Sequence, residues 1–159
     1  MNIEIFFKHI NHDPHCDIMI NNISMYKGAV VPKIPLELQI LGDIVLEIAF
    51  TNKKPDDTVV NDEGKIIQDK NFELDKILID GYDFNEFIWN SEYQANDGNV
   101  YPSCLFFGPP GKFVILFSSP FLPWLLKTRH EKYNNDPSWE EDYNYYTKAW
   151  NILKQIQTK

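Results

Sequence analysis

Hydrophobic and polar positions alternate along most of the first half of the chain. In residues 2–8, Ile3, Ile5 and Phe7 share one side of an extended backbone, which predicts a strand with one buried face. Further strands are predicted at 16–20, 23–31, 36–40, 44–50, 58–60, 65–67 and 72–79. This part of the chain should therefore consist almost entirely of β-strands.

Turn-forming residues separate these strands. Asn21 and Asn22 tolerate positive φ and predict a short hairpin turn. Gly64 suits the left-handed position of a four-residue loop in a later hairpin. Pro32 and Pro35 limit the strand near them to an edge or an interrupted pairing, because proline has no N–H for a ladder.

The apolar face of segment 72–79 changes side partway along the strand. Its apolar residues fall on even positions at first and on odd positions later. A shift of one residue turns every following side chain to the other face of a sheet. We therefore predict a β-bulge near Asp75 and Lys76, which would return the apolar residues to one side.

The second half of the chain has a different pattern. Residues 90–111 are mostly turn-formers and predict a long connection, whereas 113–117 is nearly all apolar and predicts a central strand covered on both faces. Residues 121–133 predict a helix, and a capping box at Ser138 begins a second one. The apolar stripe of this second helix comprises Trp139, Tyr143, Tyr146, Trp150 and Leu153. The stripe would pack on the sheet or dock another subunit.

Strands first and helices last predict a mostly β protein, an antiparallel β-sandwich of jelly-roll type with a C-terminal helical cover. A chain of 159 residues is long enough for one domain with a full core. We predict a single domain over 1–159, with the sandwich in 1–119 and the helical segment in 120–159.

Composition narrows the classes of partner. The net charge of −8 repels phosphate backbones and argues against nucleic acid. No apolar run approaches the roughly 18 residues of a membrane span, and the N-terminal residues lack the pattern of a signal peptide. The two cysteines, Cys16 and Cys104, are expected to be buried thiols, with a disulfide as the alternative.

Two groups of residues could hold a metal ion. His9, His12, His15 and Cys16 have ligand types suited to zinc, but a second ligand element is lacking. The carboxylates of Asp56, Asp57 and Asp69 would meet at one end of the sheet if the intervening hairpin folds back, and calcium prefers such oxygen ligands. The alternative for these carboxylates is a solvated acidic rim.

Common catalytic motifs are absent from the sequence. It has no G-x-S-x-G, P-loop or G-x-G-x-x-G, and its many carboxylates form no recognisable pair. We therefore predict that the protein is not an enzyme.

Two stretches resemble a known family. Phe50-Thr51-Asn52 and the run from Asp69 to Gly81 are similar to the F-x-N-D loop and the D-R-N-L-x-V-x-x-I-x-V-x-G strand of calcium-dependent xylan-binding modules, which are small β-sandwiches. Lys53 replaces the loop aspartate, Lys70 replaces the arginine, and the hairpin between the two stretches is extra.

This resemblance implies a glycan as ligand and calcium as cofactor. It places Asp69 and Asn71 in the matching run, as candidate ligand-binding residues. Trp89, Tyr93 and Tyr101 are candidates for stacking on sugar rings, because aromatic faces pack on apolar surfaces. The alternative is that these three rings fill the end of the sandwich.

A second resemblance covers more of the chain. An I-D-G strand end and the block GKFVILFSSPFLPWLL at 111–126 are similar to short uncharacterised proteins of tailed phages. The resemblance implies a viral origin and a sandwich like that of a carbohydrate-binding module. Because a signal peptide is lacking, we expect synthesis in the host cytoplasm, and association with the virion belongs to the alternative function given below. The resemblance implies no mechanism.

The sequence thus predicts a non-catalytic β-sandwich binding module directed to a glycan. The alternative is a phage virion structural or assembly protein whose partners are other proteins of the particle. The oligomeric state is left open.

Overall fold

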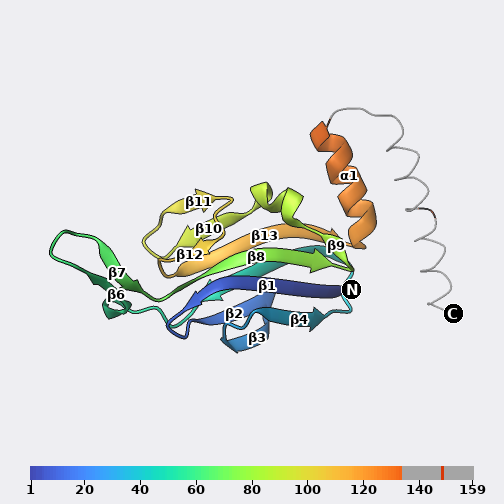
Figure 1. Ribbon diagram of the computed structural model, residues 1–159. Coiled ribbons are helices and arrows are strands. Elements are labelled where there is room, and N and C mark those ends of the chain that lie inside the picture. Colours follow the sequence, from blue (N-terminus) through green and yellow to red (C-terminus); the bar gives the residue numbers. More distant parts are fainter. Residues whose placement is uncertain (134–147, 149–159) are drawn as a thin grey trace. The chain divides into compact units, whose positions relative to one another are not determined.

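The chain forms two β-sheets, a separate two-stranded hairpin and an α-helix in a computed structural model that describes residues 1–133 and 148 (Figure 1). The side chains of Glu86, Trp89, His130, Lys132 and Tyr133 are outside this description. No helix in the described part of the chain is long and apolar enough to cross a membrane.

The first sheet has five strands. The order is β12-β8-β1-β4, and β9 also pairs with β8. Its strands are β1 (Asn2–Asn11), β4 (Lys33–Glu37), β8 (Asn71–Ile79), β9 (Tyr82–Asp83) and β12 (Phe106–Phe107). β4 lies at the edge, as the prolines predict, although it begins earlier than expected and contains Pro35.

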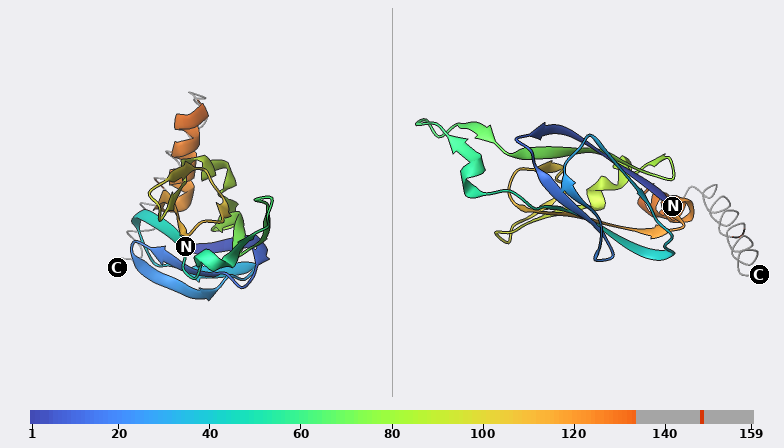
Figure 2. Two further views of the ribbon diagram at one scale, coloured as in Figure 1. Left: turned by 90° about the vertical axis from the view of Figure 1, so that its left-hand side faces the viewer. Right: turned by 90° about the horizontal axis from the view of Figure 1, so that it is seen from below.

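The second sheet has six strands in the order β11-β10-β13-β5-β2-β3. Its strands are β2 (His15–Ile20), β3 (Ile23–Ala29), β5 (Gly42–Phe50), β10 (Glu92–Ala95), β11 (Val100–Pro102) and β13 (Gly111–Ser119). The hairpin consists of β6 (Thr58–Val60) and β7 (Ile66–Asp69), and it projects beyond one end of the two sheets (Figure 1, Figure 2).

Within residues 1–133, three helical segments accompany the strands. They are the 3-10 turns η1 (Pro55–Asp57) and η2 (Asn85–Asn90) and the helix α1 (Phe121–Tyr133). The bounds of α1 match the predicted helix, whereas the second predicted helix and its aromatic stripe lie outside the described residues.

The chain divides into two compact units. One comprises residues 2–38 and 44–116, and the other comprises residue 1, residues 39–43 and the chain from 117 onward. In the second unit the first turn of α1 is anchored by rings: Phe121 lies 6.0 Å from Phe117 and 5.6 Å from Trp124, between ring centroids.

Aromatic rings join the two sheets within the first unit. Phe72 of β8 stacks on Phe107 at 4.3 Å and meets the edge of Phe50, from the opposite sheet, at 5.1 Å. Tyr93, also from the opposite sheet, meets Phe107 at 5.1 Å. All four rings are buried. These contacts make the two sheets a sandwich and confirm the predicted fold class.

The predicted β-bulge is present in β8. Phe6 pairs with Lys76 and the next residue, Phe7, pairs with Leu74, so Asp75 is left without a partner in the ladder. Asp75 is exposed, while the residues that alternate on either side of it are buried. The bulge thus keeps both halves of the strand facing the core.

The predicted hairpin turns are also present. Asn21 and Asn22 have φ values of 48° and 65°, and Gly64 has a φ of 77°. Such values are accessible to asparagine and glycine at little cost.

Three expectations need correction. The stretch 90–111 is not one loop, because it contains β10, β11 and β12. β13 is central in its sheet, but the middle of the strand is covered on one face and open on the other, because Leu116 is 60% exposed. Both cysteines are free thiols, but Cys104 is only half-buried.

Gly111 provides a test of the sandwich. A Cβ at this position would lie 2.6 Å from the Gln94 carbonyl oxygen and 2.8 Å from the Ala95 Cα. Both are backbone atoms of the paired strand, so Gly111→Ala should lower the free energy of unfolding by about 1–3 kcal/mol in urea denaturation. Gly28→Ala is the matched control, since its Cβ would meet nothing closer than 3.4 Å. Equal stability of the two variants would contradict the register.

Candidate functional site

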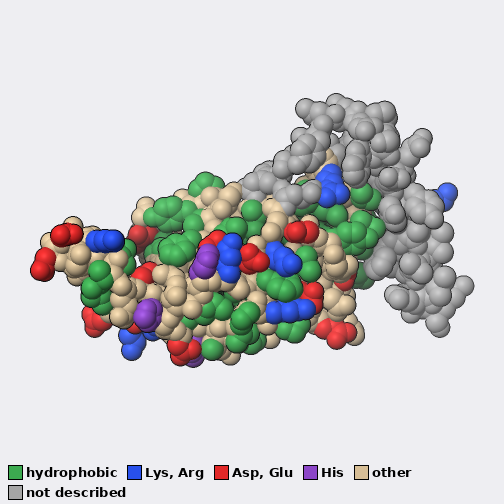
Figure 3. Space-filling model, viewed as in Figure 1, with side chains coloured by type: hydrophobic (Ala, Val, Ile, Leu, Met, Phe, Trp, Pro, Cys, Tyr) green, Lys and Arg blue, Asp and Glu red, His purple; other side chains and the backbone are tan. Residues whose placement is uncertain are grey.

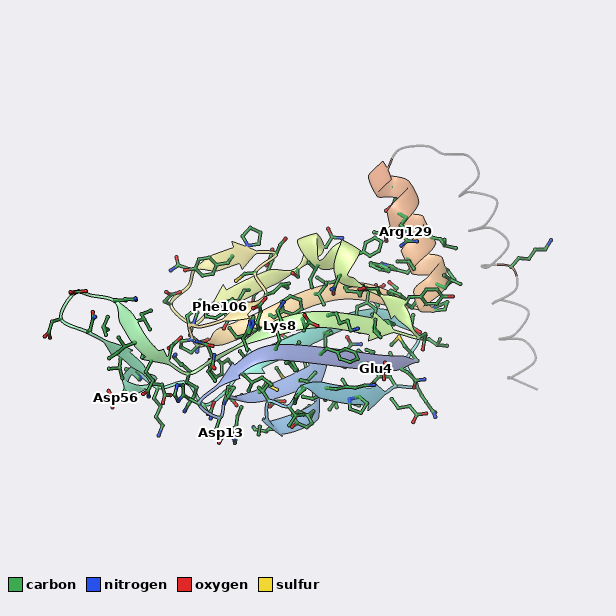
Figure 4. All side chains as sticks on the ribbon, viewed as in Figure 1. Glu4, Lys8, Asp13, Asp56, Phe106 and Arg129 are labelled. Carbon is green, nitrogen blue, oxygen red and sulfur yellow. The ribbon has the colours of Figure 1, made fainter. Side chains whose placement is uncertain are left out.

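A cleft of about 400 Å³ lies at the base of the β6–β7 hairpin. It is lined mainly by apolar atoms, and we call it the hairpin-base cleft. Its lining residues are Lys53, Lys54, Pro55, Thr58, Ile66, Asp69, Phe106, Gly108, Pro109 and Pro110. Figure 4 shows two landmarks around it, Asp56 in η1 and Phe106 in β12.

Asn52 fixes the chain where β5 ends and the cleft begins. Its Oδ1 accepts a hydrogen bond of 2.8 Å from the His15 N–H, and its Nδ2 donates to the Asp13 carbonyl at 3.0 Å. A buried or half-buried amide with both ends satisfied holds a loop in one conformation. The next residue, Lys53, is thereby directed toward the hairpin base.

Lys53 and Asp69 form an ion pair at the foot of the hairpin. Their side chains are only 6% and 14% exposed. The Lys53 ammonium also donates to the Lys70 carbonyl at 2.7 Å. Asp69 Oδ1 accepts a second hydrogen bond from Thr58 at 2.6 Å, and Oδ2 accepts one from Asn71 at 3.1 Å.

These partners determine the charge state of Asp69. Burial alone would raise its pKa, but the hydrogen bonds from Lys53, Thr58 and Asn71 stabilise the carboxylate and hold the pKa below its usual value. Asp69 is therefore a fixed anion with its oxygens already occupied.

Asp57 is neutralised in a similar way. Its Oδ2 accepts a hydrogen bond of 2.7 Å from the Lys54 N–H and lies 3.1 Å from the Lys70 ammonium. The backbone hydrogen bond and then the Lys70 contact lower the pKa of Asp57, against the effect of partial desolvation. Lys70 also contacts the Asn52 carbonyl at 3.5 Å, and its own carbonyl accepts a hydrogen bond from Lys53, which links the two ion pairs.

This donor set does not fit calcium. Asp57 and Asp69 each have a lysine as counter-ion, so the two pairs carry no net charge. Asp56, the third predicted ligand, is exposed. Within residues 1–133 and 148, no three carboxylate, imidazole or thiol groups converge on a possible metal position. A divalent cation needs uncompensated oxygen ligands, and here lysines already compensate them.

The predicted zinc ligands are also separate. His9 Nδ1 contacts Glu73 at 2.9 Å, and His15 Nε2 lies 3.5 Å from Asp13. Cys16 is fully buried in the core, and burial raises the pKa of its thiol to about 12. A buried neutral thiol is a packing residue rather than a ligand.

Phe106 forms the aromatic wall of the hairpin-base cleft. Its side chain is 46% exposed. The ring lies against Gly108, where an added Cβ would come within 2.4 Å of its Cε1 atom. Glycine at 108 therefore leaves the space that this ring occupies.

The three predicted stacking rings have different locations. Tyr93 is fully buried, and its hydroxyl donates to the Pro109 carbonyl at 2.6 Å, so it supports the cleft wall from inside and has no face for a sugar. Burial raises the pKa of the Tyr93 hydroxyl. Tyr101 is exposed on the edge strand β11 and does not line the cleft. The Trp89 side chain is outside the described part.

Asn71, the remaining predicted ligand residue, lies behind the cleft. Its Nδ2 donates to Asp69 and its Oδ1 accepts from Asn11 at 2.8 Å. Asp69 and Asn71 are in contact, and their role in binding a ligand stays a prediction. Sequence reasoning missed Phe106, and it noted Lys53 only as a departure from the resembled pattern.

Two other surfaces lack the features of a binding site. The outer face of β1 and β8 carries lysines, carboxylates and His9 that pair among themselves, such as Lys8 with Glu73 at 3.1 Å (Figure 3). A second hollow of about 770 Å³ follows β1 and β4, and its lining residues include Glu4, Glu37 and Asp80 but no aromatic ring.

Comparison with known proteins gives one structural relative. No family model and no curated protein matches the sequence. The fold is similar to that of the solved structure of vCBM60 in complex with galactobiose, with a TM-score of 0.50 and 14% identity. The alignment covers 72% of this chain and 96% of that chain. The protein therefore has a β-sandwich fold similar to that of this carbohydrate-binding module.

The depressed pKa of Asp69 predicts a pH-dependent contribution to stability. A carboxylate with a lowered folded pKa stabilises the fold above its unfolded pKa of about 3.9, and this stabilisation is lost as pH falls through the folded value. At pH 7, Asp69→Asn should lower the free energy of unfolding by about 2 kcal/mol. The deficit should shrink below about pH 4.

Urea denaturation followed by circular dichroism at pH 7 and pH 3 would measure the difference. Asp62→Asn is the control, because Asp62 is exposed on the hairpin loop. A deficit of the same size at both pH values would contradict the role given to the ionised Asp69.

Proposed function

We propose that this protein is a non-catalytic binding module that takes a glycan in the hairpin-base cleft. The observation that carries the proposal is the half-exposed Phe106 ring facing the same cleft as the Lys53–Asp69 pair. A flat apolar surface beside fixed polar groups suits a sugar, whose rings have apolar faces and hydroxyl edges.

The size and charge of the cleft support a neutral glycan. Its volume of about 400 Å³ is typical of small-ligand sites. Lys53 and Asp69 cancel each other, and only Lys54 adds a charge among the lining residues. The chain as a whole carries −8, which disfavours strongly anionic polysaccharides.

The structural relative supports the same class of ligand, since it was solved with galactobiose. Its low identity of 14% gives no residue-level correspondence. Galactobiose and xylan are therefore suitable first probes, the second because of the sequence resemblance described above.

Phe106→Ala tests the location of the site. Loss of the ring should weaken binding by about tenfold, because stacking on one aromatic face contributes roughly 1.4 kcal/mol. The measurement is isothermal titration with galactobiose, together with affinity electrophoresis through xylan. Tyr101→Ala is the matched control, an exposed ring outside the cleft. A variant of Phe106 that binds as the wild type would exclude this cleft.

A protein partner is a second candidate, favoured by the exposed apolar side chains of the hairpin. Val60, Ile66 and Ile67 are 52%, 58% and 63% exposed, on an element that projects from the sheets (Figure 1). Contiguous apolar side chains on a projecting element are typical of interaction surfaces.

The particle proteins of a phage are the partners that we propose for this second function. Mass spectrometry of purified particles should then detect the chain, and Ile66→Ser with Ile67→Ser should remove it from them. Absence of the wild-type chain from particles would exclude the virion function.

A further inference from the structure

We propose that the Lys53 ammonium is the resident cation of the hairpin-base cleft, binding a ligand oxygen there and making a divalent metal unnecessary. The inference has two halves. The ligand half, that Lys53 binds a ligand oxygen, rests on the proposed glycan function. The cation half, that Lys53 takes the place of a divalent metal ion, does not depend on that function. The proposal starts from the disagreement between the calcium expected from the sequence and the lysines that the structure places among the carboxylates.

The first argument is the burial of Lys53. Its side chain is 6% exposed, and lysine is almost never buried to this degree without a partner. Here the ammonium contacts a carboxylate from one residue and a carbonyl oxygen from the next, Asp69 and Lys70. Carboxylate and carbonyl oxygens are also the ligands that calcium takes in loops. The ammonium group thus contacts the same types of oxygen atom that would coordinate a hard metal ion.

The second argument is electrostatic balance. The Lys53–Asp69 and Lys70–Asp57 pairs are neighbours, and together their two positive and two negative charges sum to zero. A divalent cation entering this cluster would meet two ammonium groups and carboxylates that already accept hydrogen bonds from Thr58, Asn71 and the Lys54 N–H. Repulsion between the like charges opposes its binding.

The third argument concerns the donors of Lys53. An ammonium has three N–H donors. Two have partners, Asp69 Oδ1 and the Lys70 carbonyl oxygen. Lys53 also lines the cleft, where Thr58 already donates its hydroxyl to Asp69 and the other lining residues, apart from Lys54, are Pro55, Ile66, Phe106, Gly108, Pro109 and Pro110, which have no acceptor side chain. A hydroxyl oxygen of a bound sugar would supply the third acceptor.

A donor held in this way has a specific advantage. The Lys53 stem is already immobilised by burial, so binding a ligand orders no further side chain there. Its charge also makes the hydrogen bond to a hydroxyl oxygen stronger than a neutral one. Recognition would therefore combine stacking on Phe106 with one charged donor, in the absence of any metal.

The cation half is tested by thermal unfolding of the full chain. The wild-type Tm should be the same in calcium chloride and in EDTA. Lys53→Met should lower Tm by about 5 °C or more, because it leaves Asp69 buried without its counter-ion. Lys65→Met removes the same charge from the exposed hairpin loop and should leave Tm unchanged. A rise of the wild-type Tm in calcium, or an unchanged Tm in Lys53→Met, would overturn the proposal.

The ligand half is tested by affinity electrophoresis through xylan and galactan. Lys53→Met should lose retardation and Lys65→Met should keep it. The double variant Lys53→Met, Asp69→Asn removes the stranded carboxylate, so it should recover part of the Tm without recovering retardation. Retardation of the double variant equal to that of the wild type would overturn the ligand role of Lys53.

The two hypotheses fail in different ways. If the wild type is retarded by neither polysaccharide and by no member of a glycan array, the glycan function fails and the ligand half fails with it. The Tm comparison between calcium and EDTA still decides whether Lys53 has replaced a metal.

Discussion

The sandwich depends on one irregularity, the bulge at Asp75 in β8. β8 pairs with β1, β9 and β12, so it is the strand through which the first sheet is held together. Without the extra residue, Phe72 and Leu74 would turn to solvent while Ile77 and Ile79 stayed in the core. Phe72 carries the ring contacts to Phe50 of the opposite sheet. The bulge is therefore what allows the two sheets to share one apolar interior.

The same strand positions the cleft. β8 begins at Asn71, directly after the Asp69 and Lys70 that form the ion pairs, and β12, which pairs with β8, carries Phe106. A shift in register of β8 would therefore displace the polar side of the cleft and its aromatic wall together. Tyr93 adds a fixed point from the opposite sheet by holding the Pro109 carbonyl. The register of β8 therefore determines both the packing of the core and the geometry of the cleft.

Local patterns were sufficient for much of this fold. The alternation of apolar and polar residues predicted the strands of the first half of the chain. The shift of the apolar residues from even to odd positions predicted the bulge, and the Asn21-Asn22 pair predicted the turn. Each of these patterns depends only on residues close together in sequence. β12 was not predictable in this way, because a two-residue strand exists only through its pairing with Glu73 and Phe72. Similarly, nothing near Lys53 indicates that its ammonium meets a carboxylate 16 residues later. The cleft is built from such long-range contacts, which explains why the sequence did not single out Phe106 as one of its lining residues.

The hairpin and the ion pair also depend on each other. Lys53 and Asp69 stand on the two sides of the inserted segment, so their contact closes it at the base, where Thr58 Oγ1 also binds Asp69. Closing a loop costs chain entropy, and a short flexible insertion without a strong contact at its base would fray. A bound metal could close it only while occupied, whereas a lysine is part of the chain and is always present. Lys53 therefore keeps the base of the hairpin closed at all times, because its ammonium group cannot dissociate from the chain.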